Sequence, residues 1–365
     1  MPQILLKKHD KQLKFFEESI KSDYTRKVYR CYLKNYMDYL DTDLLLDSDP
    51  KKIEQSIMEF VISLKKTKSY AAIHNYLSAV LAFYKINDIV LNVNKIKRFL
   101  PDKKKSNKDR GYTHGEILRL LEFADERMRT VILLLASTGM RIGAIPILTL
   151  GNLETIEIEI GVKIYKIIVY ENHNEEHFTF CTPECARAID EYLEMRKRYG
   201  EKLTRDSFLI REQFDIRDPF AISKCQKTVA ITLECKMIDL GIRSGIRSRQ
   251  TLEGTGKGKY QGGSFRKQVP IAHGFRKFFT TQLVNSRLNS EIREMLIGHK
   301  IGLASCYYKP TDDDFLIEYQ KAINNLTINE INKLKMQVKK LEIKNSQLEQ
   351  LAADVAILKR KWKLK

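Results

Sequence analysis

Hydrophobic residues recur with a helical period through the first hundred positions of the chain. They fall mostly three or four residues apart, which gathers them on one face of each helix. They are Phe15, Phe16, Ile20, Tyr29, Tyr32, Leu33, Tyr36, Met37, Leu40, Ile57, Phe60, Val61, Leu64, Ile73, Tyr76, Leu77, Val80, Leu81 and Tyr84. Basic residues stand between these stripes, among them Lys21, Arg26, Lys27, Lys65, Lys66 and Lys68. The pattern predicts an all-helical domain with a basic face over residues 13–100, after a tail at residues 1–12.

A different pattern begins after residue 112. Helices are predicted at residues 117–121, 131–136, 183–198 and 219–240. Segments that alternate or are rich in β-branched residues predict strands at residues 156–160, 163–170 and 176–180. The second domain, residues 113–325, is therefore expected to be mainly α with a small antiparallel β-sheet, an α+β arrangement.

The C-terminal region, residues 326–365, carries a heptad repeat between residues 328 and 362. One heptad position holds Ile331, Val338, Asn345 and Ala352, and the position three residues later holds Leu334, Leu341, Leu348 and Val355. A single polar residue in an apolar seam, here Asn345, favours a defined register and often a dimer. We expect a C-terminal coiled-coil helix, whose seam packs either on a second chain or back on its own domain.

Composition adds a charge argument. Lys plus Arg number 64 against 46 Asp plus Glu, which gives a net charge of +18 in 365 residues. An excess of this size indicates a polyanionic partner, of which nucleic acid is the commonest. The Lys-rich segment at residues 101–112 is a linker by composition, either a solvated loop or a strap along DNA phosphates.

Several other classes of protein are not supported. No run of about 18 apolar residues exists, and the N-terminus lacks the order of a secretory signal, so a cytoplasmic protein with no membrane partner is expected. Cys181 and Cys185 form a CxxxC without a second Cys or His pair, so free thiols are expected and no metal site. The Gly- and Lys-rich residues 253–267 lack the spacing of a phosphate-binding loop and are interpreted as a mobile basic loop.

Four short elements of the second domain carry the candidate chemistry. In STGMR, Gly139 permits a tight turn, and Arg141 stands near a helix N-terminus, where an anion is favoured. In AHGFR, His273 and Arg276 lie three residues apart and share a helix face. The guanidinium of Arg276 suits a phosphate, and His273 can carry a proton near neutral pH.

The other two elements follow closely in the chain. In LIGHK, Gly298 is a suitable helix stop, and His299 comes directly after it. In CYYKP, Tyr308 lies nine residues beyond His299, next to Tyr307. Each element alone fits an ordinary structural role, such as a helix start, a cap or a packed aromatic side chain. The four in this order form a much more specific pattern.

In order and spacing, these elements resemble those of the tyrosine recombinases, site-specific DNA recombinases of the phage-integrase type. The resemblance covers about residues 13–325 and implies a helical core-binding domain followed by a catalytic domain. The YYKPTDDD stretch, TFCTPECARAIDEYL and the C-terminal coil look most like integrases of archaeal mobile elements. The resemblance implies breakage and rejoining of double-stranded DNA through a covalent 3′-phosphotyrosine, by a homodimer or homotetramer on DNA. It implies no cofactor, neither a metal nor ATP.

The resemblance also assigns roles to individual residues. Arg141 and Arg276 hold the scissile phosphate, and His273 and His299 complete the donor set. Tyr308 is the nucleophile.

Two assignments have competitors. Tyr307 differs from Tyr308 only by spacing. The family's catalytic lysine lies in a strand-to-strand turn that here reads YENHNEEH and contains no Lys. Lys166, on the preceding strand, is chosen as the acid for the leaving group, ahead of Lys163 and of a donor from residues 253–267.

The donor set suits phosphoryl transfer. Attack on a phosphodiester adds negative charge to its oxygens, and fixed positive donors stabilise that charge. A tyrosine phenol, with a reference pKa of about 10, needs such help to act as a nucleophile. Two alternatives stay open: a type IB topoisomerase, which shares this chemistry, and a DNA-binding regulator that kept the fold but lost activity.

Overall fold

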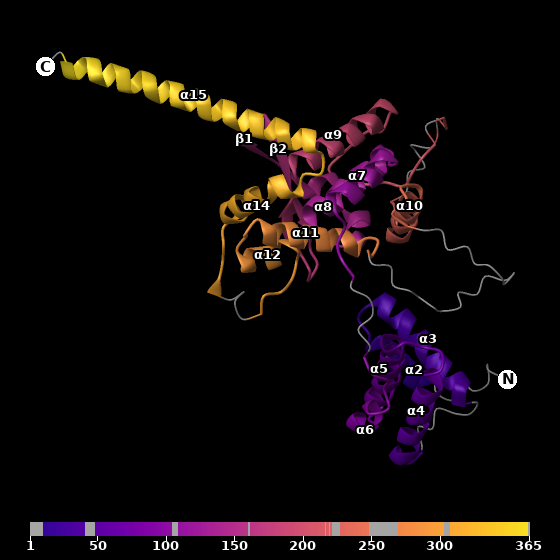
Figure 1. The fold of residues 1–365 in the computed structure, drawn as a ribbon. Coiled ribbons are helices and arrows are strands. Elements are labelled where there is room, and N and C mark those ends of the chain that lie inside the picture. The colour runs from indigo at the N-terminus through magenta and orange to yellow at the C-terminus, as the bar shows by residue number, and fades with distance from the viewer. Residues whose placement is uncertain are drawn as a thin grey trace. The chain divides into compact units, whose positions relative to one another are not determined.

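The computed structural model describes residues 10–40, 48–103, 109–159, 161–215, 217–218, 220, 227–247, 269–302 and 307–363 (Figure 1). The described residues up to 103 form one compact unit, and those from 109 onwards form another. Helices predominate, and the named strands make one three-stranded antiparallel sheet. The predicted fold class, mainly α with a small antiparallel sheet, is confirmed.

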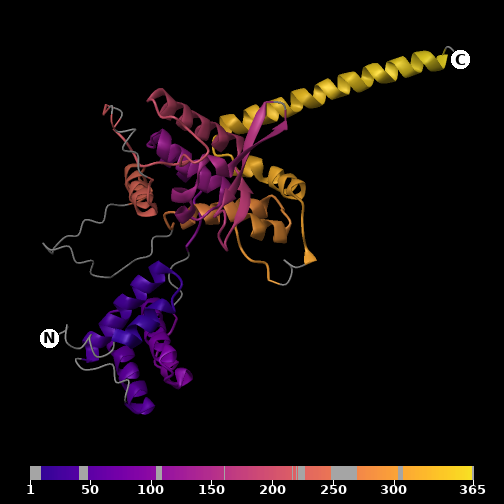
Figure 2. The same cartoon turned by 180° about the vertical axis from the view of Figure 1, so that it is seen from behind.

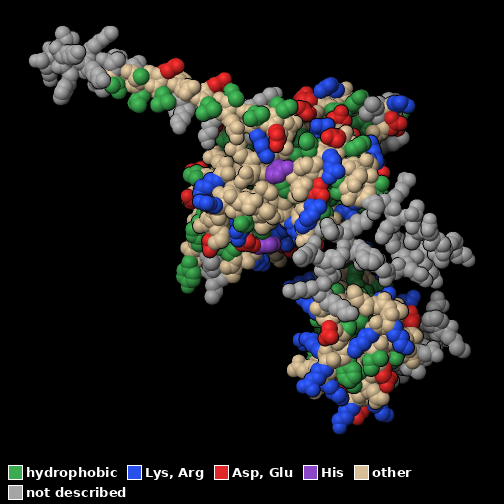
Figure 3. Space-filling view, in the orientation of Figure 1, with side chains coloured by type: hydrophobic (Ala, Val, Ile, Leu, Met, Phe, Trp, Pro, Cys, Tyr) green, Lys and Arg blue, Asp and Glu red, His purple; other side chains and the backbone are tan. Residues whose placement is uncertain are grey.

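The N-terminal unit is helical throughout its described part, as the periodicity predicts. Its helices are α2 (Asp10–Glu18), α3 (Asp23–Leu40), α4 (Pro50–Leu64), α5 (Tyr70–Ile86) and α6 (Val93–Lys97). Asp49 caps α4 just ahead of Pro50, and Ser69 caps α5. The apolar stripes form one core, which includes Phe16, Tyr36, Ile57, Phe60, Leu77, Phe83 and Tyr84. Between the stripes Lys21, Lys27, Lys65, Lys66 and Lys68 are exposed, and Figure 3 shows Lys and Arg side chains over the visible face of this unit.

The second unit is built around one buried helix, α8. Its helices are α7 (His114–Glu122), α8 (Glu126–Thr138), η1 (Ile142–Ile147), η2 (Leu150–Asn152), α9 (Pro183–Arg198), α10 (Ala230–Arg243), α11 (His273–Asn285), α12 (Ser290–Leu296), α14 (Asp312–Leu326) and α15 (Glu330–Lys363). α8 packs against α9 and α11. It ends at Gly139, whose φ of +62° is left-handed, and a Cβ there would clash with the ring of Phe279 on α11. The tight turn predicted at Gly139 is therefore required by packing as well as by backbone shape.

The sheet is a meander of β1 (Leu153–Glu159), β2 (Val162–Val169) and β3 (His177–Phe180), in that order (Figures 1 and 2). Lys166 pairs with Glu154 on one side and with Phe180 on the other, and Val169 pairs with His177. β2 packs against α9, while β3 contacts α12. The strand that follows the β2–β3 turn (residues 170–176) therefore lies against α12, the helix that precedes the LIGHK element.

One predicted helix is wrong over part of its length. The stretch 219–240 was predicted to be helical, but the helix begins only at Ala230. Lys227 instead forms a β-bridge with Arg211, and the hydroxyl of Thr228 accepts a hydrogen bond from the buried Arg127 at 2.8 Å. These long-range contacts hold residues 227–229 extended, which no local periodicity indicates.

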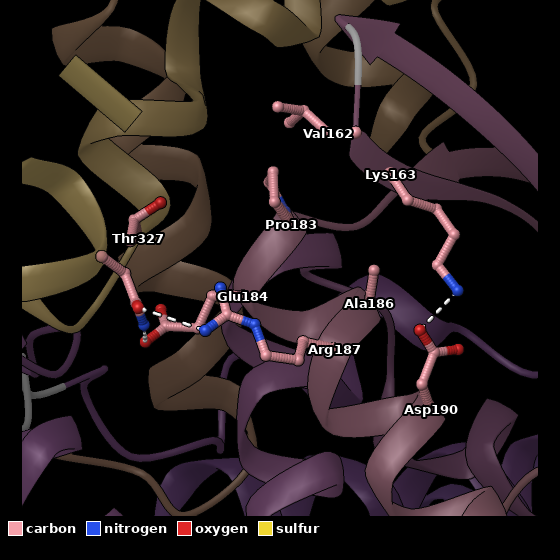
Figure 4. Close-up of a pocket in the computed structure, with 10 residues that line it drawn as sticks. Val162, Lys163, Pro183, Glu184, Ala186, Arg187, Asp190 and Thr327 are labelled. Atoms are coloured by element: carbon pink, nitrogen blue, oxygen red, sulfur yellow. Dashed lines mark hydrogen bonds and ion pairs between the residues drawn. The ribbon is translucent and has the colours of Figure 1, made fainter. Parts of the chain in front are cut away.

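α15 is fixed to its unit through a carboxylate on α9. Oε2 of Glu184 accepts a hydrogen bond from the backbone N–H of Ile328 at 2.8 Å. Oε1 accepts one from the backbone N–H of Asn329 at 3.2 Å and another from Nδ2 of the Asn332 side chain at 3.0 Å. Arg187, one turn further along α9, reaches Asn332 at 3.4 Å (Figure 4). Beyond this junction α15 projects from the unit in both views (Figures 1 and 2).

Some predictions lie outside the described residues. The predicted basic loop at residues 253–267 and residues 104–108 of the Lys-rich segment lie outside the described residues. Cys181 and Cys185 are buried free thiols. Across the described helices, none is both long and apolar enough to cross a membrane.

Candidate active site

Arg276 joins three of the four sequence elements. It lies on α11, buried, and its Nη1 donates to the carbonyl of Gly139 at 2.9 Å while Nη2 donates to that of Ile297 at 2.5 Å. Gly139 belongs to the STGMR turn, and Ile297 precedes Gly298. Burial, and then the nearby charge of Arg141, lowers the pKa of Arg276. The guanidinium is thus held in one orientation among other cations.

Arg141 and His273 stand close to this guanidinium. Arg141 directly precedes η1, and its Nη1 forms an ion pair with Oε2 of Glu175 at 2.8 Å. His273 is the first residue of α11. Burial, followed by the charges of Lys277, Arg276 and Arg141, lowers the pKa of His273. The site therefore concentrates positive charge, which favours an anionic ligand.

His299 is positioned by the end of α12. The N–H of Gly298 bonds to the carbonyl of Met295 and the N–H of His299 to that of Glu294, both at 2.9 Å, with Gly298 at a φ of +71°. This is a Schellman stop, as the sequence predicts for Gly298. The Nδ1–H of His299 donates to Oε2 of Glu294 at 2.7 Å. Because Glu294 lies on α12, this helix fixes the orientation of the ring.

Four of the six predicted site residues meet at two adjoining clefts. One cleft, of about 610 Å³, is lined by Arg141 and His299. The other, of about 470 Å³, is lined by His273, Arg276 and His299. Glu294 lines both. The two clefts therefore adjoin at His299 and Glu294, with the two arginines and His273 around them.

Tyr308 lies elsewhere in this arrangement. Tyr308 is not among the described residues that line either cleft. It is half-buried against the hydrophobic core, whereas the side chain of Tyr307 is 89% exposed. Partial burial, followed by the carboxylates of Asp314, Glu291 and Glu318, raises the pKa of Tyr308. The phenol is therefore not activated where it stands.

Lys166 lies in a neighbouring cleft. Its Nζ forms ion pairs with Asp312 and, at 3.6 Å, with Glu154, and it lies over the ring of Phe178 at 4.7 Å. Burial lowers the pKa of Lys166, but the bonds to Asp312 and Glu154 outweigh it and leave that pKa raised. The cleft that Lys166 lines meets the Arg141 cleft at His177.

Two residues at this site are not among those predicted from the sequence, namely Glu175 of the β2–β3 turn and His177, the first residue of β3. The sequence interpretation of YENHNEEH depends on a lysine, whereas the structure places a carboxylate and an imidazole from this segment at the site. Glu175 pairs with Arg141, and the ring of His177 packs over Gly298. The signal that could have found them is the placement of YENHNEEH at the position expected for a catalytic residue. Among the described residues, no cluster of three or more His, Cys, Asp or Glu side chains could hold a metal ion.

Gly298→Ala should destabilise the protein more than Gly302→Ala does. Both glycines have positive φ, +71° and +61°, so the backbone strain of alanine is similar. A Cβ on Gly298 would stand 2.5 Å from Cε1 of His177, whereas one on Gly302 would meet no heavy atom within 4 Å. Overpacking of this kind costs about 1–3 kcal/mol. Thermal melting of both variants checks the prediction, and equal melting temperatures would contradict it.

Comparison with known proteins supports the fold assignment. No protein-family model matches the chain, and no curated protein sequence matches it. Among solved structures, the Tn1549 transposon integrase (residues 82–397) in complex with circular intermediate DNA is 20% identical, with a TM-score of 0.51, over 84% of this chain and 98% of that one. The XerH site-specific recombinase bound to its difH substrate is 18% identical, with a TM-score of 0.51, over 81% of this chain and 78% of that one. The chain has the fold of the tyrosine recombinases.

Proposed function

We propose that the protein is a site-specific DNA recombinase of the tyrosine type, an integrase that breaks and rejoins DNA strands through a covalent 3′-phosphotyrosine. The observation that carries the proposal is the convergence of Arg141, His273, Arg276 and His299 on two adjoining clefts. These side chains come from three separated segments and are all donors to an anion. The two similar proteins named above, a transposon integrase and a recombinase, are both described with DNA bound, which supports the same ligand here.

The clefts bind the scissile phosphate and stabilise the charge that develops on it. A guanidinium has five N–H donors, and Arg276 uses one from each of Nη1 and Nη2 on the carbonyls of Gly139 and Ile297. Its remaining donors are held in a fixed plane for the phosphate oxygens. Donors fixed in advance are effective because they do not have to reorganise as charge builds up.

Cleavage then requires Tyr308 to enter the site. Its Oη attacks phosphorus, the bond from phosphorus to the 5′ oxygen breaks, and the 3′ side of the strand is left on the tyrosine. DNA binding moves Tyr308 from its place beside Asp314 to the clefts of its own chain or of a neighbouring one. Lys166, the residue that the sequence suggests as the acid for the 5′ oxygen, would have to leave Asp312 and Glu154 to act.

The remaining parts of the chain fit the same function. The exposed lysines of the N-terminal unit would hold the duplex by its phosphates, with an affinity that falls steeply with salt. A mobile element is the proposed source of such an integrase, and the YYKPTDDD stretch with the C-terminal helix favours an archaeal one.

The test of the function is incubation of the protein with a nicked suicide DNA site, followed by denaturing electrophoresis. A covalent protein–DNA adduct is expected. Salt-sensitive binding without an adduct would instead identify an inactive regulator. Exchange of strands between two sites, as opposed to relaxation of supercoiled DNA alone, separates a recombinase from a topoisomerase.

Glu175→Gln should raise both DNA affinity and the rate of adduct formation. In this structure the Glu175 carboxylate forms an ion pair with Arg141, and a bound phosphate would have to replace that carboxylate. Since an exposed ion pair is worth about 0–1 kcal/mol, the gain should reach about two- to fivefold. Glu171→Gln is the matched control, because Glu171 lies in the same turn but bonds Asn152. Equal rates for both variants would contradict the prediction.

The heptad seam of α15 is proposed to bind a second copy of the chain. Its apolar members stay exposed, among them Ile331 (61%), Leu334 (59%), Val338 (52%), Leu341 (61%) and Leu348 (54%). Figure 3 shows hydrophobic side chains along this projecting helix. β-Branched residues at one seam position with leucine at the other favour two strands.

Leu348→Glu should therefore lower the solution mass and weaken synapsis. Gln350→Glu adds the same charge two residues away, off the seam, and should change neither. Light scattering after gel filtration measures the mass. An unchanged mass for Leu348→Glu would remove the proposed role of the coil.

A further inference from the structure

His177 carries a buried ring nitrogen with nothing to bond. It opens β3, and its Nδ1 lies 2.9 Å from the carbonyl oxygen of Glu175. A carbonyl only accepts, so Nδ1 bears the hydrogen, and Nε2 has the free lone pair in the neutral ring. Nε2 is buried and finds no hydrogen-bond partner among the described residues. Buried polar atoms are nearly always paired, so an unpaired one at a cleft is a position where a ligand could bond.

The ring lies where the candidate active site meets the Lys166 cleft. His177 lines both clefts, and it packs directly over Gly298, next to His299. The charged and titratable groups around it are Arg141, Arg276, Tyr170, Glu175, Glu176, Glu294, His299, Lys300 and, in the second cleft, Lys166. Burial, and then the charges of Arg276 and Arg141, lowers the pKa of His177, against the opposing bond to the Glu175 carbonyl. The free protein therefore holds this imidazole neutral beside two arginines.

We propose that His177 is the proton donor to the 5′ oxygen that leaves when Tyr308 attacks the scissile phosphate, an inference that rests on the proposed function. The phosphate displaces Glu175 from Arg141, and the turn that carries both Glu175 and His177 shifts to open Nε2 to the ligand. The negative charge of the phosphodiester offsets the two arginines, so Nε2 takes up a proton from solvent.

The step balances in protons and bonds. The bond from Tyr308 Oη to phosphorus forms as the bond from phosphorus to the 5′ oxygen breaks. The proton on Nε2 passes to that oxygen, which leaves as a hydroxyl, and the ring returns to neutral with Nδ1–H still on the Glu175 carbonyl. The phenol proton of Tyr308 passes to solvent, which replaces the proton that Nε2 took from solvent. In rejoining, Nε2 takes the proton back from the attacking 5′ hydroxyl.

His177 is better placed for this role than Lys166. Lys166 is held by two carboxylates, Asp312 and Glu154, and it lines the neighbouring cleft, not the two clefts of the candidate active site. The side chain of His177 already lines the Arg141 cleft in this structure. The experiment below therefore includes both residues.

The experiment replaces the 5′ bridging oxygen of the suicide site by sulfur. A thiolate leaves without a proton, since thiols ionise with a pKa of about 8.5, so the need for an acid disappears. Adduct rates are measured on the oxygen and sulfur substrates for the wild-type protein and for His177→Gln, Lys166→Ala and His173→Gln. His173 is an exposed histidine of the same turn and serves as the matched control.

His177→Gln should slow cleavage of the oxygen substrate by about 10²–10⁴-fold, the usual contribution of an acid, and leave the sulfur substrate within severalfold of wild type. His173→Gln should match wild type on both. If His177→Gln slowed both substrates equally, its role would be structural and the proposal would fail. If Lys166→Ala alone were rescued by sulfur, Lys166 would be the acid. If the wild-type protein gave no adduct with either substrate, the proposed function itself would fail, and the two failures are thereby distinguished.

Discussion

Replacing Tyr308 by phenylalanine should abolish the covalent protein–DNA adduct, while DNA binding and the melting temperature stay near those of the wild-type protein. The ring is retained, so its packing against the core is kept, and only the Oη that attacks phosphorus is lost. No hydrogen bond of that hydroxyl contributes to the described fold, in which the pKa of Tyr308 is raised by burial and by neighbouring carboxylates. Denaturing electrophoresis of the protein with a suicide site measures the adduct.

Tyr307→Phe is the control for this prediction. Tyr307 is the adjacent residue and has the same functional group, but its side chain is 89% exposed. The Tyr307→Phe variant should form the adduct at the wild-type rate. Loss of the adduct in Tyr307→Phe, with activity retained in Tyr308→Phe, would reverse the assignment of the nucleophile.

The second large effect is expected at Arg276. Arg276→Ala should reduce the adduct rate by at least about 10²–10³-fold, the effect of removing a donor aimed at the reacting oxygens. It should also lower the melting temperature, because the carbonyls of Gly139 and Ile297 lose a buried partner, at about 1–3 kcal/mol for an unsatisfied group. Arg276→Lys should recover little activity, since a single ammonium does not reproduce two fixed N–H bonds.

Arg141→Ala separates the two roles of the arginines. Arg141 makes no bond to a carbonyl in the described fold; its ion pair with Glu175 is half-exposed and contributes about 0–1 kcal/mol. The variant should therefore lose the adduct without a fall in melting temperature. If both alanine variants melted alike, Arg276 would not be the structural link between the STGMR and LIGHK elements.

In this structure, carboxylates pair with several of the proposed site residues. Glu175 pairs with Arg141, Glu294 with His299, and Asp312 with Lys166. Each carboxylate stands where negative charge is favoured, as the phosphate would. Under the proposed function the DNA phosphate would displace them. In this structure the carboxylates offset part of the positive charge of the site, and Tyr308 lies outside the clefts. This arrangement would limit strand cleavage in the absence of a bound duplex.

Local patterns along the chain are enough to predict the features that depend on near neighbours. Helical periodicity indicated the N-terminal helices and the shared face of His273 and Arg276 on α11, and Gly139 and Gly298 marked turns that the structure has. Caps, turns and stripes follow from interactions within about four residues, which a local pattern records. The extended residues 227–229 ahead of α10 could not be predicted from the local pattern, because the buried Arg127 and the bridge to Arg211 hold them, and both lie far away in the chain.

The assembly of the site follows from long-range packing instead. Packing of α11 against α8 and beside α12 brings Arg276 to the carbonyls of Gly139 and Ile297, and the β2–β3 turn delivers Glu175 and His177 to the same place. The same packing leaves Tyr308 beside carboxylates and Lys166 in a neighbouring cleft. Such convergence depends on how whole helices and strands pack over long separations in the chain, and no spacing between residues encodes it.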